Sequence, residues 1–202
     1  MKNSILLSLV ILCLFGTKAF AQVNAINGKP IRVTTPSKEV SGESLGLYNT
    51  NFKNGQLVGI QSAADPNLFL AAWKGQTKTH TLIVVHNQLQ FEEDIFQWKL
   101  EKTSNGWFHL RNVKSNRVLH IKGEQPNSGI SLWLRPKDKT ESAQKFRFRP
   151  FDLDPSLHFI QTKLVPTLYL DIRKTAPKSG TEVMTNHFEN GRRTQKWKII
   201  AK

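Results

Sequence analysis

The sequence predicts an all-β fold built from three repeats of about 50 residues. The residue that closes each repeat is aromatic and lies among basic residues, with spacings of 48 and 51 residues: Trp98, Phe146 and Trp197. A second apolar position recurs every 50 residues: Ile60, Leu110 and Ile160. Short strands and turns repeated in this way are typical of a closed β array, because no single unit can bury its apolar face alone.

Each repeat reads as four strands joined by turn-rich loops. In the last strand of the second repeat, Phe146 and Phe148 alternate with basic residues, so the aromatic side chains are expected to face inward. Trp197 and Ile199 alternate in the same way in the third repeat. Stretches such as "DPN", "SNG", "PNSG" and "ENG" supply the turns, and no segment predicts a helix.

The N-terminal residues predict a secreted or periplasmic protein. Residues 1–21 place Lys2 before a short apolar run and end in Ala-Phe-Ala, which is the pattern of a signal peptide cleaved after Ala21. The run is too short to span a bilayer, so the mature form is predicted to have no transmembrane segment. Residues 22–54 are polar and are predicted to form an N-terminal extension.

Composition limits the chemistry that the mature chain can perform. The only cysteine, Cys13, leaves with the signal peptide, so disulfides, thiolate metal sites and a cysteine nucleophile are excluded. Histidine spacing indicates no metal site, and we expect no cofactor, no catalytic residues and no dedicated nucleic-acid motif. Without Lys2 and Lys18, 27 basic residues face 15 acidic ones, a net charge of +12 that favours anionic partners.

These features resemble the ricin-type β-trefoil family, which includes the ricin B-chain lectin domain. The resemblance covers residues 55–202, with repeats at about 55–103, 104–153 and 154–202, each ending in Gln-x-aromatic. It implies six strands closed into a short barrel, three capping hairpins and pseudo-threefold symmetry. The first repeat departs from the pattern, because Phe96 stands where glutamine is expected. The disulfides of the family are also absent.

The resemblance further implies a shallow sugar site in each repeat. In the family, an aspartate near the end of the second strand accepts hydrogen bonds from sugar hydroxyls, and an aromatic residue on the third strand stacks on the ring. Polar residues near the Gln-x-aromatic motif complete the site. A carboxylate accepts such donors strongly, and an aromatic face covers the apolar side of a pyranose.

The three repeats carry these features unequally. The first has Ala71 at the aspartate position, and no site is expected there. The second has His120 at that position, and its candidate contacts are Ser131, Trp133 and Gln144. The third has Asp171, and its candidate contacts are Asn186, His187, Thr194 and Gln195. The third is favoured, although Asp171 could instead pair with Arg173 or Gln195, and Trp133 could be a packing residue.

The leading hypothesis is therefore a secreted, non-enzymatic glycan-binding module for acidic or cell-surface glycans, of open oligomeric state. The alternative is a basic adhesion or protein-interaction scaffold that has lost sugar recognition. A polyanion-binding version of it would use five residues predicted to face solvent: Lys145, Arg147, Arg149, Lys196 and Lys198. Salt separates the two hypotheses, because screening weakens charge-driven binding more than hydroxyl hydrogen bonding.

Overall fold

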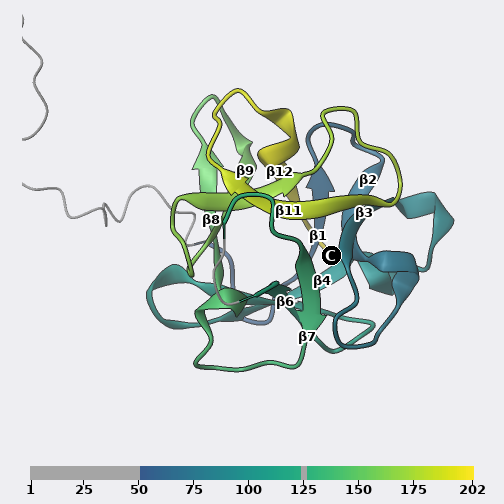
Figure 1. Cartoon of the computed structure of the whole chain (residues 1–202), viewed down its shortest axis with the longest axis vertical. Coiled ribbons are helices and arrows are strands. Elements are labelled where there is room, and N and C mark those ends of the chain that lie inside the picture. Colours follow the sequence, from purple (N-terminus) through teal and green to yellow (C-terminus); the bar gives the residue numbers. More distant parts are fainter. Residues whose placement is uncertain (1–50, 124–126) are drawn as a thin grey trace, which may run out of the picture. The chain divides into compact units, whose positions relative to one another are not determined.

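The computed structural model describes residues 51–123 and 127–202 (Figure 1). The predicted signal peptide and nearly all of the predicted extension lie outside these residues. Within the described part, no helix is long and apolar enough to cross a membrane. Regular structure there consists of strands and short 3-10 turns, in agreement with the expectation of an all-β chain.

Twelve strands in the described residues fall into three successive groups of four. The first group is β1 (Leu57–Ser62), β2 (Leu68–Ala72), β3 (Ile83–Asn87) and β4 (Gln97–Lys102). The second is β5 (Phe108–Asn112), β6 (Val118–Ile121), β7 (Leu132–Arg135) and β8 (Phe146–Phe151). The third is β9 (Asp154–Thr162), β10 (Leu168–Ile172), β11 (Thr181–His187) and β12 (Lys196–Ala201).

The first and last strands of each group close into a six-stranded barrel. Its antiparallel pairings run β1–β4, β4–β5, β5–β8, β8–β9, β9–β12 and back from β12 to β1. Because the ring closes, the barrel strands leave no unpaired edge. Figure 1 shows the three groups in successive sectors around the barrel.

The two middle strands of each group form hairpins, β2–β3, β6–β7 and β10–β11, that cap the barrel. Neighbouring hairpins are joined at the cap by β11–β3 pairing and by two isolated bridges, Leu82 with Trp133 and Ser131 with Met184. A six-stranded barrel with three hairpin caps is a β-trefoil. The predicted fold is therefore confirmed.

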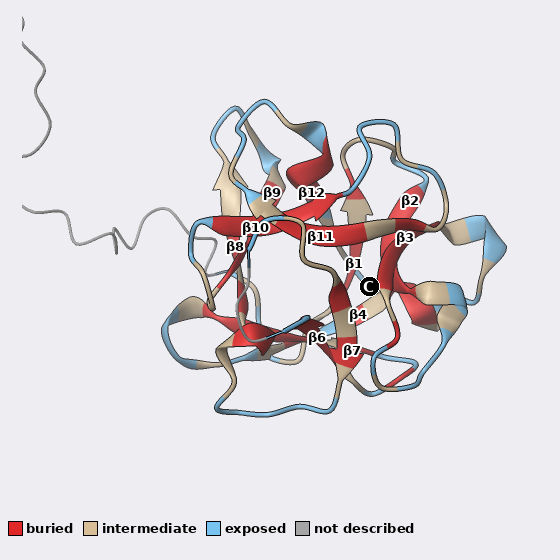
Figure 2. Ribbon diagram, viewed as in Figure 1, coloured by how far each residue is buried: buried red, intermediate tan, exposed pale blue. Residues whose placement is uncertain are grey.

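The closing aromatic residues meet in the core, which Figure 2 shows as the buried strands at the centre of the fold. Trp98, Phe146 and Trp197 are all fully buried. The Trp98 indole donates a hydrogen bond to the Leu70 carbonyl at 3.0 Å, and the Trp197 indole donates to the Leu170 carbonyl at 3.4 Å. Each bond ties the last strand of a repeat to its second strand, which positions the candidate site beside it.

Candidate functional site

The third repeat brings most of its predicted site residues together around Asp171, which is fully buried near the end of β10. Its Oδ2 accepts a hydrogen bond from Asn186 Nδ2 at 2.9 Å and a longer one from Gln195 Nε2 at 3.4 Å. Arg192 Nε lies 3.0 Å from the same oxygen. The alternative partner Arg173 instead bonds Glu182. The carboxylate thus faces inward and binds Gln195, one of its two alternative partners, so sugar binding at this cluster stays a prediction.

Gln195 acts as a brace for the loop that precedes β12. Its Nε2 donates to the His187 carbonyl at 2.7 Å, and its Oε1 accepts from the Glu189 backbone N–H at 2.9 Å. Thr194 is also buried, and its Oγ1 accepts from Arg192 Nε at 3.2 Å. Gln195 and Thr194 therefore hold the loop in place from the buried side of the site.

Asn186 and His187 provide the outer surface of the cluster. Asn186 is half-buried, and its Oδ1 accepts from Ser128 Oγ and from the His187 backbone N–H. The His187 side chain is exposed at the end of β11. Both residues are accessible to a ligand from solvent.

Arg192 is the member of this cluster that sequence reasoning missed. It bridges Asp171 to Glu189, whose Oε1 accepts from Nη1 at 2.7 Å, and Nη2 has no partner within the described part of the chain. A charged residue in the polar loop just before Gln-x-aromatic was the available signal, but "ENGRR" read as an ordinary turn. In this conformation Arg192 covers the carboxylate, so direct contact between Asp171 and a sugar requires Arg192 to move aside.

In the second repeat, a buried histidine replaces the carboxylate. Burial, followed by the positive charge of Arg135, lowers the pKa of His120 to about 4, although its Nδ1 lies 3.5 Å from Glu141 Oε1. Gln144 is buried and braces its own loop, accepting from the Asp138 N–H at 2.7 Å and donating to the Pro136 carbonyl at 2.9 Å. This position therefore supports the loop as Gln195 does.

Trp133 remains half-exposed on β7 opposite His120. The Lys122 ammonium lies 4.8 Å from the centre of the Trp133 ring, and the His80 ring lies at the same distance. The Ser131 hydroxyl bonds Glu182 of the third repeat. Trp133 thus has both packing contacts and an open surface, so stacking on a sugar stays a prediction.

In the first repeat, apolar packing takes the place of the polar cluster. Ala71 and Phe96, which stand at the aspartate and glutamine positions, are fully buried in one cluster with Phe69 and Ile95. The larger side chain of Phe96 fills space beside the small Ala71, and no carboxylate is present to bind a hydroxyl. The expectation that this repeat has no sugar site stays consistent with its geometry.

Lys196 departs from the prediction for the basic residues. It was expected to face solvent but is buried, with Nζ 3.6 Å from the centre of the Phe151 ring. Strand alternation does turn it away from the barrel interior, yet the neighbouring end of β8 covers it. Lys198 is exposed beside it, and both border a groove of about 510 Å³ that also includes Phe151, Asp154 and Arg193.

The other predicted polyanion-binding residues are half-buried. The Arg147 guanidinium stacks 4.3 Å from the centre of the Trp107 ring, and that of Arg149 lies 4.9 Å from the Phe188 ring. Such stacking holds the guanidinium groups along the surface by cation–π attraction. Lys145 lies just before β8, the strand that carries both arginines, and borders a second basic hollow.

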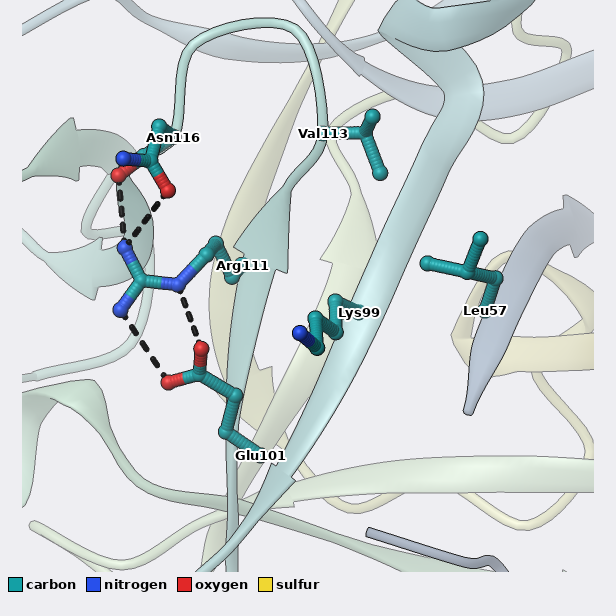
Figure 3. Close-up of a pocket in the computed structure, with 6 residues that line it drawn as sticks. All are labelled: Leu57, Lys99, Glu101, Arg111, Val113 and Asn116. Carbon is teal, nitrogen blue, oxygen red and sulfur yellow. Dashed lines mark hydrogen bonds and ion pairs between the residues drawn. The ribbon is translucent and has the colours of Figure 1, made fainter. Parts of the chain in front are cut away.

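A further hollow of about 520 Å³ lies beside β4 and β5 (Figure 3). Figure 3 shows Arg111 held between Glu101 and Asn116. The hydrogen bond from Arg111, outweighing burial and aided by Lys137, lowers the pKa of Glu101 to about 2. Glu101 therefore stays ionised, and its charge is matched by neighbouring cations.

The closed barrel with its three hairpin caps defines the class of this protein as a β-trefoil. Residues 96–186 match the family model described as ricin-type beta-trefoil lectin domain-like. This match agrees with the ricin-type resemblance that the repeats predict. No curated protein matches the chain.

Solved structures with the same fold include a design and natural lectins. The designed threefold-symmetric protein ThreeFoil aligns with a TM-score of 0.63 and 15% identity, over 71% of this chain and 97% of that chain. The Rhizoctonia solani agglutinin aligns with a TM-score of 0.62 and 19% identity, over 75% and 98%. The C-half of an earthworm R-type lectin, solved in complex with GalNAc, gives 0.54 and 15%, over 73% and 99%. At sequence identities this low, the structural similarity shows that the fold is shared.

Proposed function

We propose that the protein is a secreted, non-enzymatic carbohydrate-binding module for acidic or cell-surface glycans. The proposed organisation is a signal peptide of residues 1–21, an extension of residues 22–54 and a binding domain of residues 55–202. The observation that carries the proposal is the Asp171–Asn186–Arg192–Gln195 cluster at the sugar-site position of the third repeat. The lectin-like family model supports the same class of ligand.

The accessible atoms of this cluster suit a sugar that bears a carboxylate. Asn186 is able both to donate to and accept from a hydroxyl. Arg192 keeps Nη2 unpaired within the described residues while Nε is held by Asp171. A guanidinium binds carboxylates in a planar, directional geometry. Arg192 would therefore select an acidic sugar, while Asn186 and His187 bind its hydroxyls.

Affinity for one such sugar is expected to be weak, because the site is shallow and only the third repeat has the full polar set. Glycans on a cell surface repeat the same sugar many times, and several weak contacts then act together. Function would thus depend on repeating ligands or on an oligomer.

A glycan array tests this proposal with the mature chain from Gln22, probed with neutral, carboxylated and sulfated glycans at low and physiological salt. Asn186→Ala should abolish binding of carboxylated glycans, whereas Asn190→Ala, at an exposed asparagine in the loop that follows β11, should not. Arg192→Gln should reduce the preference for carboxylated over neutral sugars. Equal binding by the wild type and Asn186→Ala would reject this site.

The alternative is a basic adhesion or protein-interaction scaffold without specific sugar recognition. The apolar packing of Ala71 on Phe96 favours it, because one repeat has no polar site at all. Such a scaffold predicts binding to many polyanions that disappears as salt rises. It also predicts no effect of Asn186→Ala, so the same array distinguishes the two functions.

A further inference from the structure

A second hollow, separate from the Asp171 cluster, is lined by cationic groups. It encloses about 300 Å³ between the end of β4, the start of β5 and the loop that precedes β8. Its charged and titratable lining residues are all basic: Lys102, His109, Lys137, Lys139 and Lys145. They come from two stretches of the chain, residues 102–109 and 137–145, which the fold brings together.

Nearby carboxylates offset only part of this positive charge. Glu101 binds Lys137 at 2.7 Å, but the same carboxylate is also held by Arg111 (Figure 3). Asp138 Oδ1 accepts hydrogen bonds from the N–H and hydroxyl of Thr140. Within the described residues, Lys102 and Lys139 form no ion pair. The hollow therefore keeps a surplus of positive charge.

His109 lies at the back of the hollow, where it is 1% exposed. Its Nδ1 is 3.0 Å from the Gln144 carbonyl, which can only accept, so Nδ1 carries the proton in the neutral ring. No hydrogen bond is formed by Nε2 in the described part of the chain. Nε2 is thus left for a ligand, as an acceptor when neutral and as a donor when protonated.

Two hydroxyl residues complete the lining. Ser104 has no hydrogen bond from its Oγ to another described residue, whereas the Thr103 hydroxyl donates to the Trp107 carbonyl at 3.0 Å. Ser104 Oγ can therefore donate to an oxyanion or accept from a sugar hydroxyl. A volume of 300 Å³ is at the small end for ligand pockets, which suits one charged sugar residue.

We propose that this hollow binds a sulfate or phosphate ester carried by a glycan. Lysines act as separate point charges, in contrast to the planar fork of arginine, and here four of them line one hollow. This arrangement fits an oxyanion with oxygens in several directions better than a planar carboxylate. The proposal rests on the glycan-binding function above and adds a second, independent contact to it.

Calorimetric titration of the mature chain tests the proposal. The ligands are a heparin-derived hexasaccharide, its desulfated counterpart, a phosphorylated monosaccharide and vesicles that contain anionic phospholipid. Lys102→Gln/Lys139→Gln removes two pocket charges, and Lys174→Gln/Lys178→Gln removes two exposed charges that do not line the hollow. We expect the pocket variant to bind the sulfated hexasaccharide about 10-fold more weakly, and the control variant to lose less than about twofold.

Each outcome decides the proposal. Equal losses in the two variants would mean that net charge alone attracts the ligand, and would overturn it. Equal affinity for the desulfated hexasaccharide would do the same.

Relative affinity for the sulfated and phosphorylated ligands identifies the ester. If the wild type binds the vesicles but not the glycans, and the pocket variant loses vesicle binding, the bound ester belongs to a lipid. That result would reject a glycan as the carrier of the ester. Asn186→Ala should leave the preference for the sulfated over the desulfated hexasaccharide intact, so failure here is distinct from failure of the third-repeat site.

Discussion

Asp171 and Arg192 form an ion pair in which the carboxylate is completely buried and the arginine side chain remains 24% exposed, with Oδ2 and Nε 3.0 Å apart. The pair therefore connects the interior of the third repeat to its surface. Asp171 fixes the position of Arg192 and Asn186, and these two residues meet the solvent. In the closed conformation the aspartate orients the contact residues, which is a different role from the direct hydroxyl acceptor implied by the family pattern.

Replacing Asp171 should cost stability as well as binding. Asp171→Ala leaves the Asn186 and Gln195 amides without their shared acceptor, and Arg192 loses its buried partner. We expect a loss of about 2–3 kcal/mol in the free energy of unfolding, reduced from a fully buried pair because Arg192 reaches solvent. Asp171→Asn should cost less, because it keeps the shape of the acceptor. Urea denaturation measures both, and an unchanged midpoint for Asp171→Ala would contradict this account.

Placing in the first repeat the glutamine that the other two repeats have should destabilise the protein. Phe96→Gln removes a fully buried ring and places an amide beside Ala71, where no carboxylate accepts from it. We expect a loss of at least about 3 kcal/mol in unfolding free energy. Phe96→Leu, which stays apolar, should cost less. Thermal unfolding of the two variants gives the order of their stabilities. A Phe96→Gln protein that is more stable than Phe96→Leu would contradict the apolar packing of this cluster.

The fold was predictable from the sequence because equivalent positions in the three repeats carry similar residues. Trp98, Phe146 and Trp197 are buried for the same reason in each repeat, so spacing alone identified them. Arg192 was not predictable in this way, because its role depends on the path of one loop. The burial of Lys196 could not be predicted from strand alternation for a similar reason: alternation gives the face on which a residue lies but not which neighbouring segment covers that face.

Acid should destabilise the protein through His120. Its folded-state pKa of about 4 lies below the ordinary value of 6.5, so the native state binds fewer protons than the unfolded state between these values. Stability is therefore lost as pH falls through this window and levels off below it. The loss from His120 is at most about 3 kcal/mol, because Glu141 near Nδ1 favours the charged ring.

Urea midpoints measured between pH 7 and pH 4 check this expectation. Burial also lowers the pKa values of His86, His109 and His158, so the whole protein should lose stability in the same direction. His120→Gln should flatten part of the slope, and Glu141→Gln should steepen it. A midpoint that rises toward acid pH would contradict the assignment.

Binding of a sulfated glycan should take up a proton at His109. Burial first, and then the charge of Lys137, lowers the pKa of His109 in the free protein; Lys145 acts in the same direction, while Glu101 and the Gln144 carbonyl oppose them. A sulfate in the hollow would favour the imidazolium and raise this pKa on binding. Affinity should then increase as pH falls through the bound-state pKa, and level off below the free-state value.

We expect affinity for the sulfated hexasaccharide to rise roughly threefold or more between neutral pH and about pH 5.5, because the sulfate esters and the surrounding lysines keep their charges over this range. Calorimetry at pH 6 in buffers of different ionisation enthalpy measures the proton directly and needs no variant. His109→Gln should bind without this uptake if it folds. Binding of the wild type with no proton uptake, or with proton release, would remove His109 from the site and leave the four lysines and Ser104 to hold the ester.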